Sequence, residues 1–342
     1  MKLAISSPAG NPQVPPAGPD PASRLRTLLQ SAPPWTGIGV LVVVMFVGMS
    51  IGNEYFLNYA NLNNVLRGAV VPLLLALGTT FVITTGMIDL SLGSLLALDT
   101  VLMLGFMNAG LPVPVAVLAT LAASALLAGL VNGLLIARFQ LFFMVVTLGT
   151  MSIFRSVAQL GTDGTSVQLY DRAGFDFVLW LGDGSVGPVS VPVVLAAILL
   201  AASILLMRFT TFGRNLLAVG GNAGAARLAG VPVERVQILA FALNGLFIGV
   251  AAVVMAGRIQ AASPSIGIGM ELSVIAAVLL GGSSFMGGNS TFLGTLIGVV
   301  FVSLLDNALN LLQVQTFWQG VVTGAVLIVA VGIDRLRARS RT

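Results

Sequence analysis

The stretch TTGMIDLSLGSLLAL, residues 84–98, places the oxygen-bearing side chains of Asp89 and Ser91 inside an apolar segment. A charged group at membrane depth costs about 2.5–3.5 kcal/mol on insertion scales, so it normally faces a partner or a cavity. Two roles suit these residue types. Their oxygens can cap the following helix by accepting backbone N–H bonds, or they can line a path and bind the hydroxyl groups of a solute.

Further polar side chains interrupt other apolar segments: Asp99, Asn132, Asn244, Asp306 and Asn307. A buried amide either joins helices or binds a polyol. Asp99 is expected about 12 Å along a helix that begins near Ser91, because an α-helix rises 1.5 Å per residue. Arg155 is a candidate ion-pair partner for it. An ion pair that fixes helix packing and a carboxylate that reports on the substrate are both compatible with this pattern.

Several residue types that enzymes use are absent. The 342-residue sequence has no His and no Cys, and Lys2 is its only lysine. A zinc site of the usual ligands, a histidine general base, a thiolate nucleophile and a disulfide are therefore excluded. A GxxxxGK[ST] phosphate loop needs a lysine that Lys2, in a proline-rich tail, does not supply. We predict no catalytic residue, metal site or cofactor, and any ATP must bind to another chain.

The polar residues must be positioned by membrane-spanning helices. Hydrophobic residues make up 57% of the sequence, charged residues 8%, and the mean hydropathy is +1.01. This composition identifies an integral membrane protein. Apolar windows near the roughly 20 residues that span a bilayer predict an all-α polytopic domain of about ten helices over residues 35–334. The Pro- and Gly-rich residues 1–34 lack a cleavable signal and are predicted to form a disordered tail.

The predicted spans have boundaries that follow the apolar windows. They cover residues 35–52, 68–86, 91–108, 113–137, 142–160, 189–208, 237–256, 271–282, 292–312 and 316–333. Gly, Pro and polar residues break the chain after Asn61 and after Ile259. We therefore expect some of the helices to be discontinuous or re-entrant.

The distribution of charge predicts the orientation. Arginines gather in the loop 209–236 and in the tail 335–342, and cations also precede the first span, whereas the loop 161–188 holds four aspartates and one arginine. Because cytoplasmic loops carry excess Lys and Arg, both termini and the loop 209–236 are predicted to be cytoplasmic, and the loop 161–188 periplasmic. The net charge of +4 thus describes membrane orientation, and no nucleic-acid partner is implied.

A weak internal echo relates the two halves of the chain. An offset of 175 residues pairs Asn132 with Asn307 and Gln140 with Gln315, among five identities. An odd number of spans between the partners would invert the second copy, as in many transporters. In so biased a composition, chance and two inverted five-helix halves are both compatible with the echo.

Three stretches, in this order, narrow the class: GMIDLSLGS, VNGLLIARFQLFFMVVTLGTMSIFR and GRNLLAVGGNAGAARLAGVPVERVQI. Together they resemble the permease subunits of ribose-type sugar importers of the ATP-binding cassette class. The similarity continues through GMELSVIAAVLLGGSSFMGG and TFWQGVVTGAVLIVAVGID, so it covers nearly everything after the tail. The resemblance implies a homodimer in the bacterial inner membrane that translocates a monosaccharide or similar small polyol. It also implies a periplasmic sugar-binding protein and a separate cytoplasmic ATPase as partners.

The stretch NAGAARLAG in the loop 209–236 predicts a short helix, with Asn222 at its start and Gly230 at its end. Its spacing matches the "EAA, three residues, G" signature of importer permeases, with Gly224 where Glu is frequent. The resemblance implies that this loop couples to the ATPase through Gly213, Arg214, Gly221, Asn222, Ala225, Ala226, Arg227 and Gly230. A basic cytoplasmic loop that only obeys the orientation rule is the alternative.

The leading function is therefore solute translocation without chemistry on the solute. The candidate pathway residues are Asp89, Ser91, Asp99, Asn132, Asn244, Asp306 and Asn307. An ion-coupled secondary transporter, in which the three aspartates carry protons or sodium, is the alternative from another class, and the coupling loop argues against it. An intramembrane enzyme ranks third, because His, Cys and a GxGD motif are missing.

Overall fold

The computed structural model describes residue 33, residues 35–315, and residues 318, 320–322, 324–325 and 328–329. The predicted N-terminal tail and the basic C-terminal tail lie outside the described residues. Most of the predicted last span, 316–333, lies outside them as well.

The regular secondary structure of the described part of the chain is helical apart from short two-residue strands. The helices are α2 (Thr36–Gly52), α3 (Tyr59–Thr84), α4 (Leu92–Asn108), α5 (Val113–Leu126), the π-helical η1 (Leu127–Gly133), α6 (Leu134–Ala137), α7 (Phe143–Leu160), α8 (Asp176–Asp183), α9 (Val191–Phe209), α10 (Thr211–Gly221), α11 (Ala223–Leu228), α12 (Val233–Ile259), α13 (Met270–Leu280) and α14 (Phe292–Leu311). The strands are β1 (Val167–Gln168), β2 (Ser185–Val186), β3 (Val189–Ser190) and β4 (Ala261–Ala262). β1 pairs with β4 and β2 with β3, both antiparallel.

The prediction of an all-α polytopic protein is confirmed, but the count of ten spans is not. Among the described residues, six helices are long and apolar enough to cross a membrane: α3, the continuous α5–η1–α6, α7, α9, α12 and α14. The apolar helices α2, α4 and α13 are shorter. The α-helical windows of α3 and α12 are the most buried of the six, so these two helices form the centre of the molecule.

Two non-helical segments explain why α4 and α13 are short. The chain leaves α3 at Thr84 and reaches α4 only at Leu92, and it leaves α12 at Ile259 and reaches α13 only at Met270. The segment before α13 meets the start of α4, where Gly93 of α4 packs on Gly267 so closely that a Cβ on either glycine would overlap the backbone carbonyl of the other. Gly267 also has a φ of +77°, which favours glycine. The starts of α4 and α13 are thereby brought together.

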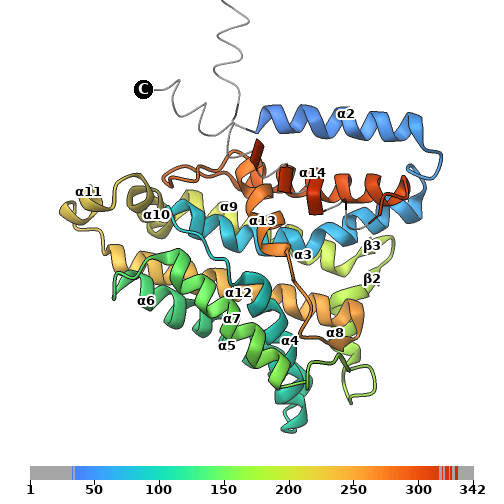
Figure 1. The fold of residues 1–342 in the computed structure, drawn as a ribbon, viewed down its shortest axis with the longest axis horizontal. Coiled ribbons are helices and arrows are strands. Elements are labelled where there is room, and N and C mark those ends of the chain that lie inside the picture. The colour runs from blue at the N-terminus through green and yellow to red at the C-terminus, as the bar shows by residue number, and fades with distance from the viewer. Residues whose placement is uncertain are drawn as a thin grey trace, which may run out of the picture.

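The basic and the acidic segments of the chain lie at opposite ends of the long axis of the molecule. α10 and α11 lie at one end, and α8, β2 and β3 lie at the opposite end (Figure 1). The basic segment 209–236 and the acidic segment 161–188 are thus separated, as the predicted topology requires. Which end faces the cytoplasm stays a prediction.

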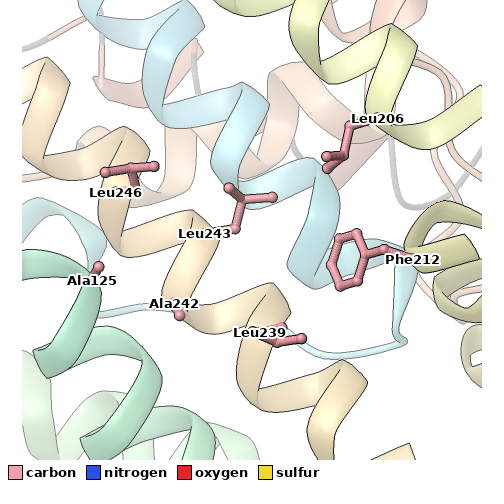
Figure 2. A pocket seen from close by; sticks show the side chains of 7 residues that line it. All are labelled: Ala125, Leu206, Phe212, Leu239, Ala242, Leu243 and Leu246. Atoms are coloured by element: carbon pink, nitrogen blue, oxygen red, sulfur yellow. The ribbon is translucent and has the colours of Figure 1, made fainter. Parts of the chain in front are cut away.

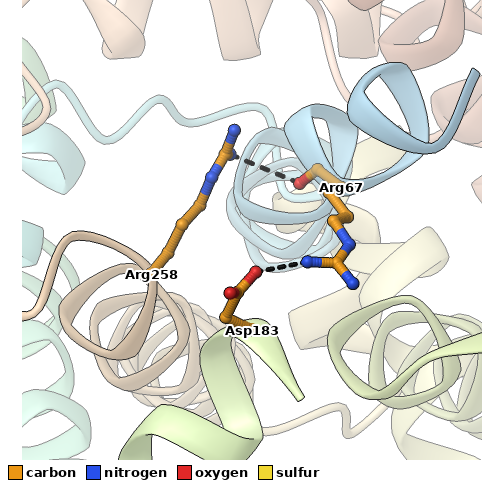
Figure 3. A network of polar contacts seen from close by, with 3 residues as sticks. All are labelled: Arg67, Asp183 and Arg258. Atoms are coloured by element: carbon orange, nitrogen blue, oxygen red, sulfur yellow. Dashed lines mark hydrogen bonds and ion pairs between the residues drawn. The ribbon is translucent and has the colours of Figure 1, made fainter. Parts of the chain in front are cut away.

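The central helices α3 and α12 run antiparallel. At the α8 end, Arg258 near the end of α12 donates to the carbonyl of Arg67 in the first half of α3, at 3.4 Å. Arg67 forms an ion pair with Asp183 of α8, so three elements are joined there (Figure 3). At the α10 end, the carbonyl of Thr84 accepts a hydrogen bond from the N–H of Gly288, at 3.0 Å.

Candidate functional site

Asp89, Ser91, Asn132 and Asn244 form one buried group, called here the Asp89 cluster, in which every residue has an exposure of 0%. Asp89 Oδ1 accepts hydrogen bonds from the Ser91 N–H at 2.9 Å and from the Ser91 hydroxyl at 2.6 Å. Asn244 Nδ2 donates to Asp89 Oδ2 at 2.9 Å. Asn132 Nδ2 donates to Ser91 Oγ at 2.8 Å and lies 3.5 Å from Asp89 Oδ1. The structure therefore brings together four of the seven predicted pathway residues.

The cluster joins three parts of the chain. Asp89 lies in the non-helical segment before α4, Asn132 lies in the π-helical η1, and Asn244 lies in the middle of α12. Asn244 fits only because α3 has Gly78 opposite it, where a Cβ would lie 2.6 Å from Asn244 Oδ1. Asp89 accepts the N–H of Ser91, the residue before α4, but no side chain caps the helix itself, so the predicted capping role is not confirmed. A role of the cluster in the path stays a prediction.

Asp99 has the opposite environment. It is also fully buried, but neither carboxylate oxygen has a hydrogen-bond partner of ordinary geometry among the described residues. Ser124 of α5 lies beside it, yet the Ser124 hydroxyl donates to the carbonyl of Gly245 at 2.7 Å. A buried carboxylate without partners is unfavourable for folding.

The predicted ion pair between Asp99 and Arg155 is wrong. The Arg155 guanidinium donates instead to the carbonyl of Pro264 and to the carbonyl of Ile266, the latter at 2.7 Å. It also interacts electrostatically with Glu271 at the start of α13. The physical reason is that the non-helical segment before α13 leaves carbonyls unpaired at membrane depth, and the arginine satisfies them.

Asp306 and Asn307 lie on α14 and are half-buried. Asn307 forms a reciprocal amide pair with Asn61 of α3, with Nδ2 to Oδ1 distances of 2.8 Å and 3.2 Å. Asn61 is about 25 Å along α3 from Gly78, the residue opposite Asn244. The structure therefore does not bring these two residues to the Asp89 cluster, and Asn307 joins helices.

An exposed polar stripe on α7 was not predicted from the sequence. Ser152, Ser156 and Gln159 are exposed, and the half-buried Arg155 lies between them in the same helical register. The spacing of three and four residues places all four on one side of the helix. Together with Glu271, which interacts with Arg155, they form what we call the α7–α13 polar face. The SxxRSxxQ pattern of residues 152–159 was the signal that could have revealed it.

The short helix predicted in the basic loop is confirmed as α11. The Asn222 side chain accepts from the N–H of Ala225 at 2.9 Å, and Gly230 follows the helix with a φ of +82°. The preceding helix α10 was not predicted. Its start is capped by Thr210, whose hydroxyl accepts from the N–H of Gly213 at 3.2 Å.

The exposure of the predicted coupling residues divides them into two groups. Ala226 is 6% exposed and packs inside the protein, so the expectation that it faces a partner is corrected; Gly213 is buried as well. Their small size serves the packing of α11 and α10 on the rest of the chain. The exposed residues of the set are Arg214, Gly221, Asn222, Ala225, Arg227 and Gly230. Leu228 is 93% exposed, and sequence reasoning missed it.

Comparison with known proteins identifies the class. Residues 61–331 match the family described as "Branched-chain amino acid transport system / permease component". The match covers most of the chain, and the protein therefore belongs to this family of permease components. As a permease component it is not itself an enzyme, and the ion-coupled alternative is not favoured.

Individual relatives are permeases of sugar transport systems. The chain is 38% identical to the ribose import permease protein RbsC of Bacillus subtilis over 91% of its own length and 94% of the relative's. It is 36% identical to the L-arabinose ABC transporter permease protein AraH of Azospirillum brasilense, covering 90% and 89%. It is 32% identical to the xylose transport system permease protein XylH of Haemophilus influenzae, covering 87% and 94%. No solved structure gives a significant match.

Proposed function

We propose that this permease component carries a monosaccharide or similar small polyol across the bacterial inner membrane. A separate cytoplasmic ATPase drives the transport, and a periplasmic sugar-binding protein delivers the solute. The relatives are named for ribose, L-arabinose and xylose, which share the polyhydroxyl chemistry of small sugars. The α7–α13 polar face is the structural observation that carries the proposal.

The α7–α13 polar face is suited to a hydrated sugar path. Ser152, Ser156 and Gln159 are exposed on a helix that is long and apolar enough to span the membrane. Charged and polar groups at that depth avoid lipid and face a water-filled cavity or protein. Serine hydroxyls, the Gln159 amide, the Arg155 N–H groups and the Glu271 carboxylate together supply donors and acceptors for sugar hydroxyls.

A second copy of the chain would enclose this path. The exposed side of α7 is the side that lipid would otherwise contact, and a two-fold arrangement is the commonest one for identical subunits. Two polar faces opposite each other would form a channel with polar walls and an apolar outside. The homodimer is therefore part of the proposal.

The predicted pathway residues of the Asp89 cluster have a supporting place in this proposal. In the structure their other polar atoms bind one another, and Oδ1 of Asn132 and of Asn244 have no hydrogen-bond partner among the described residues. If the helices separate during transport, these two oxygens are the acceptors available to a sugar hydroxyl. Asp99 and Asp306 remain candidates for shaping the selectivity of the path.

Two inverted halves are supported by the bounds of the central helices. α3 covers Tyr59–Thr84 and α12 covers Val233–Ile259, so their ends are 174 and 175 residues apart. The two helices run antiparallel, which an inverted repeat requires. The non-helical segments that follow them begin with the same offset, and each precedes a short helix.

Coupling to the ATPase is assigned to α10 and α11. Exposed Leu228 offers an apolar contact at one end of the molecule, and the adjacent exposed Arg227 is a residue type that is enriched in interface hot spots. Leu228→Glu is expected to lower co-purification of the ATPase at least tenfold without changing membrane insertion. Gly224→Glu should be tolerated, since Gly224 is exposed and importer permeases often have Glu there.

Single cysteines test the path, because the chain has none of its own. Ser152→Cys and Ser156→Cys should react with a small membrane-impermeant methanethiosulfonate reagent. Ile153→Cys is the matched control, since Ile153 is also exposed but lies on the apolar side of α7. Labelling should stop uptake of radiolabelled ribose in vesicles that hold the ATPase and the binding protein. Equal labelling at all three positions, or none at the two serines, would show that this face is not a water-filled path.

A further inference from the structure

An apolar cavity opens on the side of α12 near the α10 end of the molecule. Its volume is about 400 Å³, and Figure 2 shows its lining side chains on α12, α9 and α10. These are Leu206, Phe212, Leu239, Ala242, Leu243 and Leu246. Ala125 of α5 forms the remaining wall. We call this the α12 groove.

The α12 groove is open rather than sealed. Leu239 is 54% exposed and Leu246 is 39% exposed, although both lie on a helix that is apolar enough to span the membrane. No side chain that lines it offers a hydrogen bond, so water and sugar are poor occupants. A hydrocarbon chain can fill the groove without leaving any polar group unpaired.

The charge at one end of the groove indicates the kind of hydrocarbon ligand. Arg235 is exposed and lies one helical turn before Leu239, on the same side of α12. Arg208 and Arg214 lie two residues from the lining residues Leu206 and Phe212, a spacing that turns them to another side of their helices. Arg235 forms no ion pair within the described part of the chain. An anionic headgroup would neutralise it.

The dimensions of the groove agree with a lipid held in one leaflet. From Arg235 to Leu246, α12 rises about 16 Å. Half of the hydrocarbon core of a bilayer is about 15 Å thick. A phospholipid with its phosphate at Arg235 therefore extends its acyl chain along the whole groove.

We propose that the α12 groove is a binding site for an anionic phospholipid, with one acyl chain in the groove and the phosphate on Arg235. The site connects α9, α10 and α12, and α12 begins directly after α11. A bound lipid thus stabilises the arrangement of the helices that carry the proposed coupling surface. This inference does not depend on which solute the protein carries.

The test is lipid retention by the detergent-purified full chain, measured by native mass spectrometry after incubation with dioleoyl phosphatidylglycerol or dioleoyl phosphatidylcholine. The two lipids have the same chains and differ in headgroup charge. We expect phosphatidylglycerol to be retained at a stoichiometry near one per chain and to raise the unfolding temperature, and phosphatidylcholine to be washed away. Equal retention of both lipids would overturn the site and leave only a nonspecific lipid shell.

Substitutions test the groove for the acyl chain and the arginine contact to the phosphate separately. Leu239→Trp narrows the groove at an exposed lining residue and should lower retention, whereas Leu118→Trp, at a residue of α5 that is 68% exposed and outside the groove, should not. Arg235→Gln changes no packing and should lower retention about fivefold, the effect of one arginine near an anionic surface. Arg172→Gln at the opposite end is its control. Unchanged retention in Arg235→Gln, or disulfide cross-linking between copies through Ala242→Cys, would overturn the proposal, the latter because a second chain would then cover the groove.

Discussion

Asp89 lies just before α4, and Asp99 lies ten residues further on, inside that helix. Both side chains are fully buried, yet their hydrogen-bonding surroundings differ completely. Asp89 accepts hydrogen bonds from Ser91 and Asn244, whereas Asp99 accepts none of ordinary geometry within the described part of the chain. A buried carboxylate with donors stabilises the fold, and one without them destabilises it. Residue type and burial therefore do not define the role of an intramembrane acid; its partners do.

The same contrast separates the Asp89 cluster from the α7–α13 polar face. Both hold polar groups on apolar helices, but the side-chain donors of the cluster bind inside it, whereas the face exposes Ser152, Ser156 and Gln159. The Ser152 hydroxyl donates to the carbonyl of Leu148 and still offers an acceptor. We interpret the first as a scaffold and the second as a surface for water and solute. The predictions below test this division, starting with the largest expected effect.

Removing the Asp89 carboxylate should have the largest effect on folding. In Asp89→Ala the Ser91 N–H, the Ser91 hydroxyl and the Asn244 amide lose their acceptor, and each unpaired buried donor costs about 1–3 kcal/mol. We expect a loss of about 3–5 kcal/mol and little protein in the membrane. The measurements are membrane yield and thermal unfolding in detergent. Wild-type yield with altered uptake would instead make Asp89 a pathway residue.

The contact between the start of α4 and the non-helical segment before α13 should be nearly as sensitive to substitution. Gly93→Ala would overlap the carbonyl of Gly267, with an expected cost of about 2–3 kcal/mol. Gly149→Ala on the exposed side of α7 is the matched control, since nothing lies within 4 Å of the position of its Cβ. Unfolding temperatures of the two purified variants give the comparison. Similar values would mean that the segments are not held together as described.

Replacing Asp99 should act on transport and not on the amount of protein. Asp99→Ala removes a buried carboxyl group that has no hydrogen bond of ordinary geometry among the described residues, so the avoided desolvation cost offsets the lost packing. We expect an unchanged or higher unfolding temperature and a changed KM or sugar preference. Uptake competition with ribose, arabinose and xylose measures the change in KM and in sugar preference. Lost expression with unchanged kinetics would place Asp99 in the scaffold beside Asp89.

The amide pair between Asn307 and Asn61, near the start of α3, should contribute least to the free energy of unfolding. Asn307→Ala breaks the reciprocal bonds with Asn61, and interhelical hydrogen bonds in membranes contribute about 0.6 kcal/mol on average. A double-mutant cycle with Asn61→Ala measures the coupling. A coupling above about 2 kcal/mol would place this pair with the Asp89 cluster rather than among ordinary helix contacts.

The class of the protein and several local features could be predicted from the sequence. Composition predicts an all-α membrane protein, motif order predicts an importer permease, and the NAGAARLAG stretch predicts a capped helix that the structure has. These features depend on residues a few positions apart, because capping bonds and apolar periodicity are local. The hydrogen bond from Ser91 to Asp89 is local in the same sense.

The tertiary structure alone decided which distant residues meet. Asp89 is bound by Asn244, 155 residues away, and Arg155 binds carbonyls more than 100 residues away instead of the predicted Asp99. Whether Ala226 faces a partner or the interior likewise depends on how α11 packs on the rest of the chain, which its own sequence does not specify. Polar groups inside a membrane bind the nearest available partner, and that partner is set by the packing of helices that are distant in the sequence.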